Sequence, residues 1–295
     1  MSDAPLLTIR DLSVGYPAGS CTVRVVDSVS LDLAPGEFLG IVGESGSGKT
    51  QLLLSLLGLN GPLARLGGSV RYRGQELIGA PERTLARLRG ARIGMIFQDP
   101  MTALNPYLTI GTQLTEGVRH HHGLGRRAAR LRALELLDAV HVPEPEQRFA
   151  QHPHELSGGM RQRIVIAMTL ICEPDIVLAD EPTTALDVTV QAQILTLLRE
   201  LRARTRAALI LVTHDLGVIA EVADRVAVMY AGRIVEQASV ERLFAHARHP
   251  YTEGLRRSIV ELTGPLPARL ARITGNPPDP AALPPGCAFA PRCAY

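Results

Sequence analysis

The chain has 295 residues, which is long for one compact domain and short for two, so we expect one large domain with a smaller inserted or appended lobe. Hydrophobic residues make up 46% of the chain and charged residues 20%, a globular composition that excludes a fibre or a disordered tail. The 31 basic and 29 acidic residues leave a net charge of +2 without a long run of one sign. This balance argues against a nucleic-acid partner that is recognised mainly through charge.

The sequence predicts a chain that does not cross a membrane unaided. Its longest apolar runs, such as residues 164–172, are shorter than the roughly 20 residues that span a bilayer. The first ten residues include Asp3 and lack the basic and apolar regions of a secretory signal. Four cysteines are too few and too scattered for a disulfide framework, which favours the reducing cytoplasm. They are Cys21 and Cys172, which we expect to be packing residues, and Cys287 and Cys293 in the tail.

The start of the chain predicts strands, because short β-branched stretches are separated there by glycine and proline. They lie within residues 6–42, in the runs LLTIRDLSV, TVRVVDSVSLDL and EFLGIV. A glycine-rich segment follows at 43–50, and the run 51–59 has apolar residues at helical density. Residues 67–74 predict a further strand between glycine turns. A strand, a glycine loop and a helix are therefore expected in succession.

The middle of the chain predicts helices, because Leu, Val and Ala recur at helical spacing between polar faces from 100 to 173. From 174 to 237, β-rich runs alternate with helical ones, which is the pattern of a parallel sheet with crossover helices. We therefore assign residues 1–99 and 174–237 to an α/β core and residues 100–173 to an inserted α-helical subdomain. Residues 238–295 form a C-terminal appendage that is Pro-rich beyond about 264.

The segment GESGSGKT at 43–50 fits the phosphate-binding pattern G-x-x-x-x-G-K-[ST]. Its backbone N–H groups and the N-terminus of the next helix would cradle nucleotide phosphates. Lys49 is the single lysine of the chain, and its ammonium would lie between the β- and γ-phosphates, while the Thr50 hydroxyl is suited to Mg²⁺. The alternative is a flexible turn before a helix. The other expected contact residues are Gly43, Glu44, Ser45, Gly46, Ser47 and Gly48.

The run IVLADE at 176–181 predicts a buried strand that ends in two acids. We expect Asp180 to hold the Mg²⁺ shell and Glu181 to activate water. The alternative is a pair of acids that only caps the next helix. The glycine loop elsewhere in the chain favours the magnesium interpretation.

The segment LSGGM at 156–160 begins a helix and is a candidate second anion site. Ser157, Gly158 and Gly159 would expose backbone N–H groups at the positive end of that helix. One triphosphate does not need two such sites in one chain, so we expect this segment to close over a nucleotide that another copy holds. The alternative is an ordinary serine N-cap followed by a glycine turn.

These three motifs do not stand alone. Gln98 in FQDP, TALD at 184–187 and His214 in VTHD join them in the order and spacing of the ATP-binding cassette (ABC) ATPases, which the chain resembles from residue 6 to about 237. The resemblance implies a P-loop NTPase core of α/β class with an N-terminal antiparallel β-subdomain. It also implies a head-to-tail dimer, in which the glycine loop of one subunit faces the LSGG segment of the other across ATP and Mg²⁺.

The same resemblance implies a role for four further residues. Tyr16 would stack on adenine, Gln98 would contact Mg²⁺ and the attacking water, and His214 would touch the γ-phosphate. Asp187 would cross the dimer interface. Two of these residues keep an alternative, because Tyr16 beside Pro17 could be a half-buried turn aromatic and His214 could be structural.

A narrower resemblance covers the whole chain. Met160 in LSGGMRQR, FQDPMTALNP at 97–106, HPYTEGL at 249–255 and the tail PPGCAFAPRC are similar to the ATP-binding subunits of bacterial dipeptide, oligopeptide and nickel importers. This implies ATP hydrolysis that drives import, with two transmembrane permease subunits, a second ATPase subunit and an extracytoplasmic binding protein as partners. It places the chain at the cytoplasmic face of the inner membrane, peripherally and without a nucleic-acid partner.

Two groups of residues could be taken for metal sites. His120, His121 and His122 are consecutive, and consecutive helical residues point about 100° apart, so we expect a solvated helix face. Some of the resembling subunits carry an iron–sulfur cluster in the tail. Such a cluster takes four thiolates, so Cys287 and Cys293 would need ligands from elsewhere, and we expect free thiols.

Three rival functions share parts of this pattern. A DNA-repair or chromosome-organising ATPase would insert a long coiled coil, but only 57 residues without sustained heptads separate Gln98 from Leu156. A regulatory subunit that only binds nucleotide would not need Glu181 and His214. A ribosome-associated factor would have two cassettes in one chain. For the importer subunit, we expect the insert between 100 and 155 to dock the permease through an exposed face that includes Met101 and Leu104.

Overall fold

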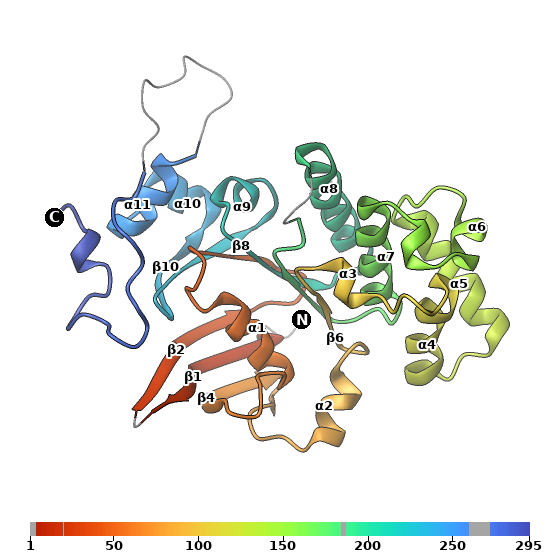
Figure 1. Ribbon diagram of the computed structural model, residues 1–295, viewed down its shortest axis with the longest axis horizontal. Coiled ribbons are helices and arrows are strands. Elements are labelled where there is room, and N and C mark those ends of the chain that lie inside the picture. Colours follow the sequence, from red (N-terminus) through yellow and green to blue (C-terminus); the bar gives the residue numbers. More distant parts are fainter. Residues whose placement is uncertain (1–3, 20, 184–186, 260–271) are drawn as a thin grey trace, which may run out of the picture. The chain divides into compact units, whose positions relative to one another are not determined.

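The structure is a computed structural model that describes residues 4–19, 21–183, 187–259 and 272–295 (Figure 1). The chain forms two compact units. Met1–Ala80 and Leu211–Tyr295 make up the first unit, and Pro81–Ile210 the second. The boundary falls within strand β8 (Ala208–Thr213), so the first unit is built from both ends of the chain and the second from its middle.

The first unit contains a four-stranded antiparallel sheet in the order β2-β1-β4-β5 (Figure 1). Strand β1 (Leu7–Ala18) pairs with β2 (Cys21–Leu33) and with β4 (Arg65–Tyr72), and β5 (Gln75–Glu76) pairs with β4. Buried and less buried side chains alternate along much of β1, which gives the strand one buried face, since successive side chains of a strand point to opposite faces. This sheet is the antiparallel β-subdomain that the resemblance implied.

Strand β3 (Phe38–Val42) of the same unit supports the glycine loop. It runs parallel to β9 (Arg225–Tyr230), which pairs on its other side with the antiparallel β10 (Arg233–Ser239). All residues of β3 are buried. Helix α9 (Leu216–Val222) packs so closely that a Cβ atom on Gly40 would lie 2.6 Å from the Ile219 side chain. The segment before the glycine loop is therefore held tightly on several sides.

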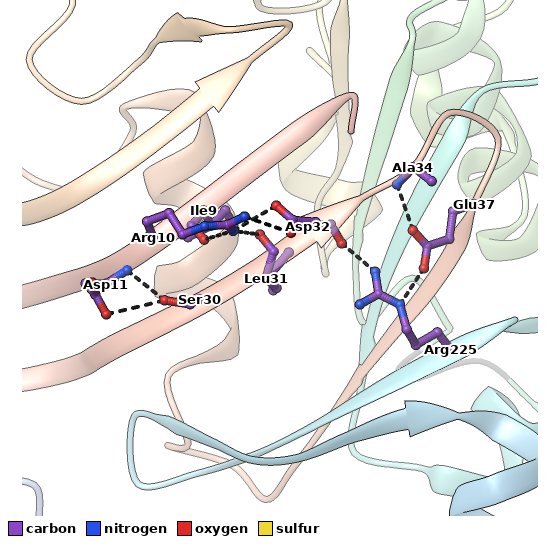
Figure 2. A network of polar contacts seen from close by, with 9 residues as sticks. All are labelled: Ile9, Arg10, Asp11, Ser30, Leu31, Asp32, Ala34, Glu37 and Arg225. Carbon is purple, nitrogen blue, oxygen red and sulfur yellow. Dashed lines mark hydrogen bonds and ion pairs between the residues drawn. The ribbon is translucent and has the colours of Figure 1, made fainter. Parts of the chain in front are cut away.

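A network of polar contacts lies beside the N-terminal end of β3 (Figure 2). The Nε atom of Arg225 donates to Glu37, 2.6 Å away, and its Nη2 atom donates to the main-chain oxygen of Asp32. The Asp32 carboxylate pairs with Arg10 at 2.8 Å, and this hydrogen bond holds the pKa of Asp32 below its ordinary value. The network joins β1, β2 and β9 within the first unit.

Short helices complete the first unit. Helix α1 (Lys49–Leu57) follows the glycine loop, and α10 (Val240–Ala245) and α11 (Pro250–Arg257) follow β10. The tail carries one helical turn, η2 (Ala290–Arg292). The rest of the described tail is irregular, in agreement with its high proline content.

The second unit combines parallel strands with most of the helices. Strand β6 (Ile93–Ile96) runs parallel to β7 (Ile176–Asp180), and the strand order is β8-β7-β6. The spacing of Ile110, Leu114 and Val118 puts one face of α4 in the interior. The helices are α2 (Glu82–Leu88), α3 (Pro100–Ala103), α4 (Ile110–His122), α5 (Arg126–Ala139), α6 (Pro145–Ala150), α7 (Gly158–Leu170) and α8 (Val188–Thr205), with the 3-10 turn η1 (Pro153–Glu155).

Two sequence-based expectations about exposure are wrong. Leu104 is only 4% exposed, because Gln113 of α4 hydrogen-bonds both main-chain groups of Asn105 and draws this stretch against the helix. Cys21 is exposed at the start of β2, where its thiol donates to the Ala18 carbonyl, whereas Cys172 is buried as expected. The Met101 side chain lies outside the described residues.

Two predicted segments also fall outside the described residues. They are the first three residues of TALD, 184–186, and part of the Pro-rich tail, 260–271. Among the described helices, none has the length and apolarity needed to cross a membrane.

Candidate functional site

The glycine loop lies between β3 and α1, as the sequence predicts. The Lys49 side chain is buried, and its Nζ atom donates to the carbonyl oxygens of Gly43 (2.7 Å) and Glu44 (2.9 Å) and lies 3.4 Å from the Ser47 hydroxyl. The ammonium thus folds back over its own loop. These bonds fix a positive charge beside the backbone N–H groups at the start of α1, which is an arrangement suited to phosphate.

Two glycines of the loop are required by close approach of other chain segments. A Cβ atom on Gly43 would lie 2.1 Å from the carbonyl oxygen of Met229 in β9. Gly48, the N-cap of α1, has φ +99°, and a Cβ atom there would lie 2.2 Å from the carbonyl oxygen of Val25. The loop is therefore a close-fitted turn at these two glycines.

Glu44 makes contacts that sequence patterns did not reveal. Its N–H donates to the Tyr251 hydroxyl at 2.9 Å, so this N–H is directed at α11. Its carboxylate forms a two-point ion pair with Arg292, with distances of 2.7 and 3.0 Å. Residue 44 was expected to contribute to the phosphate cradle, and here its N–H and side chain both serve contacts with the C-terminal part of the unit.

Three other predicted residues of the first unit lie on or directly after neighbouring elements. Tyr16 belongs to strand β1, not to a turn, and its hydroxyl donates to Gln51 Oε1 of α1 at 2.7 Å. Thr50 is exposed in the first turn of the same helix. His214 is exposed directly after β8. The partner Gln51 carried no motif signal, because its position depends on the packing of α1 beside β1.

The second unit holds the two acids at the end of β7. Asp180 is 3% exposed and is the last residue of the strand. Glu181 follows with φ +45°, a left-handed conformation that non-glycine residues rarely adopt. The buried Gln162 donates to the Pro182 carbonyl at 2.7 Å and fixes the next turn of the chain. Helix α8 is capped by Asp187, so neither acid is its N-cap and the capping alternative is wrong.

The remaining predicted residues of this unit lie at the beginnings of helices or after strands. Ser157 is the N-cap of α7 and accepts the Met160 N–H at 3.4 Å, while Gly158 and Gly159 form the first turn. Ser157 is therefore an N-cap, but the two glycines belong to the helix and do not form a separate turn. A helix N-terminus with two glycines is able to bind an anion, so this role of the segment stays a prediction. Gln98 is exposed just beyond β6.

Comparison with known proteins decides the family. Residues 26–184 match the family described as ABC transporter, and residues 235–295 match the oligopeptide/dipeptide transporter C-terminal region. The chain belongs to the ABC transporter family. It is the ATPase component of this family, with the P-loop α/β fold that the sequence predicted.

Curated relatives match this ABC ATPase along its whole length. A putative peptide import ATP-binding protein of Brucella abortus (strain 2308) is 51% identical over 100% of the chain and 89% of the relative. The dipeptide transport ATP-binding protein DppD of Bacillus subtilis (strain 168) is 50% identical over 98% of the chain and 86% of the relative. The oligopeptide transport ATP-binding protein OppD of Salmonella typhimurium is 48% identical, with the same coverage.

Solved structures give the same fold. The dimeric post-hydrolysis state of the ATP-binding cassette MJ0796, bound to ADP and Pi, has a TM-score of 0.71 at 28% identity. The match covers 79% of this chain and 98% of that chain. The structure of CbiO1 from Clostridium perfringens, part of the transporter complex CbiONQ, has a TM-score of 0.69 at 25% identity.

The residue types of the ABC ATPase suit magnesium but not an iron–sulfur cluster. Thr50 of the first unit carries a hydroxyl and Asp180 of the second a carboxylate, and each is a hard oxygen ligand of the kind that Mg²⁺ prefers. Cys287 is exposed and Cys293 partly exposed, and two thiolates do not complete a cluster that takes four. Within the described ranges no group of three or more His, Cys, Asp or Glu side chains could hold a metal, His120–His122 included.

Proposed function

We propose that this ABC ATPase powers the import of dipeptides or oligopeptides through a partner permease. The observation that carries this proposal is the match of residues 235–295 to the oligopeptide/dipeptide transporter C-terminal region, joined in one chain to a complete nucleotide loop. The full-length relatives named for peptide, dipeptide and oligopeptide transport support the same solute class. Nickel remains the second candidate solute that the resemblance implies.

The residues of the first unit would bind and orient the nucleotide. Lys49 and the backbone N–H groups of the loop would hold the β- and γ-phosphates, and Tyr16 would stack on the adenine. Lys49 would exchange its present carbonyl partners for phosphate oxygens, an exchange that its three N–H donors permit. His214 would contact the γ-phosphate and orient it for attack.

The residues of the second unit would carry the hydrolytic step. Gln98 and Asp180 would hold Mg²⁺, with Thr50 of the first unit as a further ligand, and the metal would supply positive charge to the phosphates. Glu181 would accept a proton from the attacking water, and Gln98 would orient that water. The position of Glu181 directly after the buried Asp180 at the end of β7 supports this assignment.

The active unit would be a dimer of ATPase subunits. Ser157, Gly158 and Gly159 would close over a nucleotide held by the second subunit, and Asp187 would cross the interface. Support comes from the exposed helix N-terminus at Ser157 and from the similar MJ0796 cassette, whose solved structure is dimeric. The second subunit would be another copy of this chain or a related ATPase.

The assembly would lie at the cytoplasmic face of the inner membrane. Two transmembrane permease subunits would form the pathway, and an extracytoplasmic binding protein would deliver the solute. Because Leu104 is buried, the docking face on the second unit has to use other residues, and the nearby Tyr107 is 88% exposed. We place the permease contact at Tyr107 and the adjacent, partly exposed Leu108.

Uptake by intact cells tests the solute class. Cells with and without this chain would be given a radiolabelled dipeptide, a labelled pentapeptide and ⁶³Ni²⁺ in parallel. We expect peptide uptake that depends on the chain and is lost in the Lys49→Ala variant. Uptake that depends on the chain for nickel alone would move the assignment to the metal importers.

A further inference from the structure

The C-terminal segment of the chain holds the phosphate-binding loop at Glu44. Arg292 lies 248 residues from Glu44 in sequence, yet its Nη1 and Nη2 atoms donate to the two carboxylate oxygens at 2.7 and 3.0 Å. The Arg292 side chain is only 5% exposed. A two-point, charge-assisted pair with so little exposure defines the position of the carboxylate much more narrowly than a surface ion pair does.

Further contacts hold Arg292 itself in place. Its Nε atom donates to the Thr274 carbonyl at 2.9 Å, and its guanidinium carbon lies 5.8 Å from the ring centres of Tyr230 and Phe289. Glu44 and Tyr230 together raise the pKa of Arg292 above its ordinary value, chiefly through the hydrogen bond to Glu44. These contacts therefore hold the guanidinium in one position, from which it donates to Glu44.

Tyr251 provides a second connection to the same loop residue. Its ring is fully buried and lies 4.6 Å from the Tyr230 ring, and its hydroxyl accepts the Glu44 N–H. Burial raises the pKa of this phenol, so it stays neutral and keeps the hydroxyl proton. His249 sets the start of α11 by accepting the Tyr251 N–H through Nδ1 at 3.1 Å.

The contacts at Glu44 continue to the phosphate-binding lysine. The Glu44 carbonyl accepts from Lys49 Nζ, while the N–H and carboxylate of the same residue are held by Tyr251 and Arg292. All three polar groups of Glu44 therefore have defined partners, two of them in the C-terminal part of the unit. A displacement of that part would move the loop and with it the resting position of Lys49.

We propose that Arg292 and Tyr251 are positioning residues for the loop at 43–50, so that the C-terminal segment sets the affinity of the chain for nucleoside triphosphate. The proposal rests on the proposed function, because it assigns a role towards the nucleotide that this loop would bind. Both positioning residues act through Glu44.

The tail also packs closely against α11 and β9, in agreement with a positioning role. A Cβ atom on Gly254 in α11 would lie 2.8 Å from the Ile273 side chain, so glycine permits this approach of the tail. Phe289 is buried against Tyr230 and Tyr251, with ring centres 5.3 and 5.5 Å apart. The tail is thus anchored at two points that precede Arg292 in the sequence.

Nucleotide titration of the full-length chain tests this role. We would measure the dissociation constant of Mg²⁺–ATPγS, a slowly hydrolysed analogue, for wild type, Arg292→Ala, Arg292→Lys and Tyr251→Phe. Arg292→Ala should weaken binding about tenfold through misplacement of the loop, and Arg292→Lys should recover part of the loss. Tyr251→Phe should weaken binding less, because Arg292 still holds Glu44.

Arg225→Ala is the matched control. Arg225 belongs to the same unit and pairs with a glutamate, Glu37, at the opposite end of β3 from the loop (Figure 2). Its loss should lower the melting temperature without changing ATPγS affinity. Equal losses of affinity in Arg225→Ala and Arg292→Ala would overturn the proposal, because both would then reflect general destabilisation.

A double-mutant cycle with Glu44→Ala decides whether Arg292 acts through Glu44. The double variant should bind ATPγS no more weakly than the weaker single variant, since both remove the same connection. Losses that multiply, or an unchanged affinity in Arg292→Ala, would overturn the positioning role while leaving the ATPase assignment intact. Absence of binding by wild type would instead overturn the proposed function.

Discussion

At the residue scale, the only lysine of the chain, Lys49, is held by several atoms of its own loop. Three atoms of its own loop surround Lys49 Nζ, and the loop can take this shape because Gly43 and Gly48 leave room for Met229 and Val25. Arginine would bring a wider, planar group into the same space. The position therefore selects for a compact ammonium and not for positive charge alone.

Replacement of Lys49 by alanine should weaken ATP binding by roughly 10- to 100-fold, the value of a lost hydrogen bond to a charged group. Lys49→Arg should also bind poorly, since the guanidinium does not fit the loop. Equilibrium titration with ATP measures both variants. Unchanged affinity in both would contradict the assignment of 43–50 as the phosphate-binding loop.

Glu181→Gln should retain ATP binding and lose turnover by at least about 100-fold, because the amide keeps the shape of the side chain but cannot accept a proton from water. Steady-state phosphate release measures this loss, and gel filtration with ATP should show an accumulated dimer. Glu173→Gln is the matched control: Glu173 also has a left-handed backbone, φ +51°, but pairs with Arg132 on the surface. Wild-type turnover in Glu181→Gln would exclude it as the base.

At the scale of elements, sequence patterns predicted the helices and strands whose formation depends on residues nearby in the chain. The helix expected to begin within 156–160 is observed at Gly158–Leu170, since Ser157 provides a local N-cap. The expected strand–loop–helix succession around 43–50 is also observed. Leu104 was misjudged because Gln113, nine residues later, determines its burial through Asn105. The partners of Glu44 lie 207 and 248 residues away, beyond the reach of any periodicity.

Helix α11 should make the stability of the first unit sensitive to pH. Burial lowers the pKa of His249, although Glu236 opposes this shift, and the neutral ring accepts the Tyr251 N–H. The unfolded chain therefore binds a proton at a higher pH than the folded one. The stabilisation is complete above the ordinary pKa of about 6.5 and is lost as the pH falls below it.

We therefore expect the melting temperature to fall when the pH is lowered from about 7.5 to about 5.5. His249→Asn keeps an N-cap acceptor that does not titrate and should reduce this fall. His121 in the second unit also has a lowered pKa, because it is partly buried and lies beside His120 and His122. It serves as the comparison for a histidine outside α11. An identical pH dependence in His249→Asn and wild type would exclude a contribution from this cap.

At the scale of the whole molecule, the predicted site residues are divided between the two units. The first unit holds the glycine loop, Tyr16 and His214, while the second holds the acids of β7 and the segment after β6. The sequence predicted a separate helical region within 100–173, because its periodicity differs from that of the flanking segments. The observed second unit, Pro81–Ile210, is larger than this predicted region, because it also includes β6 and β7.

Tyr107→Ala should reduce peptide uptake severalfold and leave the basal ATPase activity of the isolated subunit unchanged, because the Tyr107 side chain is 88% exposed and lies outside the core. Uptake by cells and phosphate release by the pure subunit measure the two effects. Leu63→Ala, which removes an exposed apolar side chain of the first unit, should change neither. Normal uptake by Tyr107→Ala would exclude this residue from the permease contact.

The contact between Glu44 and the C-terminal segment also determines which truncated proteins keep the native surroundings of the glycine loop. A truncated protein that stops near residue 237 would retain every nucleotide motif and would look like a complete minimal cassette. It would lack Tyr251, Phe289 and Arg292, so Glu44 would lose both partners from that segment and Tyr230 would lose its aromatic neighbours. Inhibitor screening or crystallography on such a fragment would study a loop that has been released from its support.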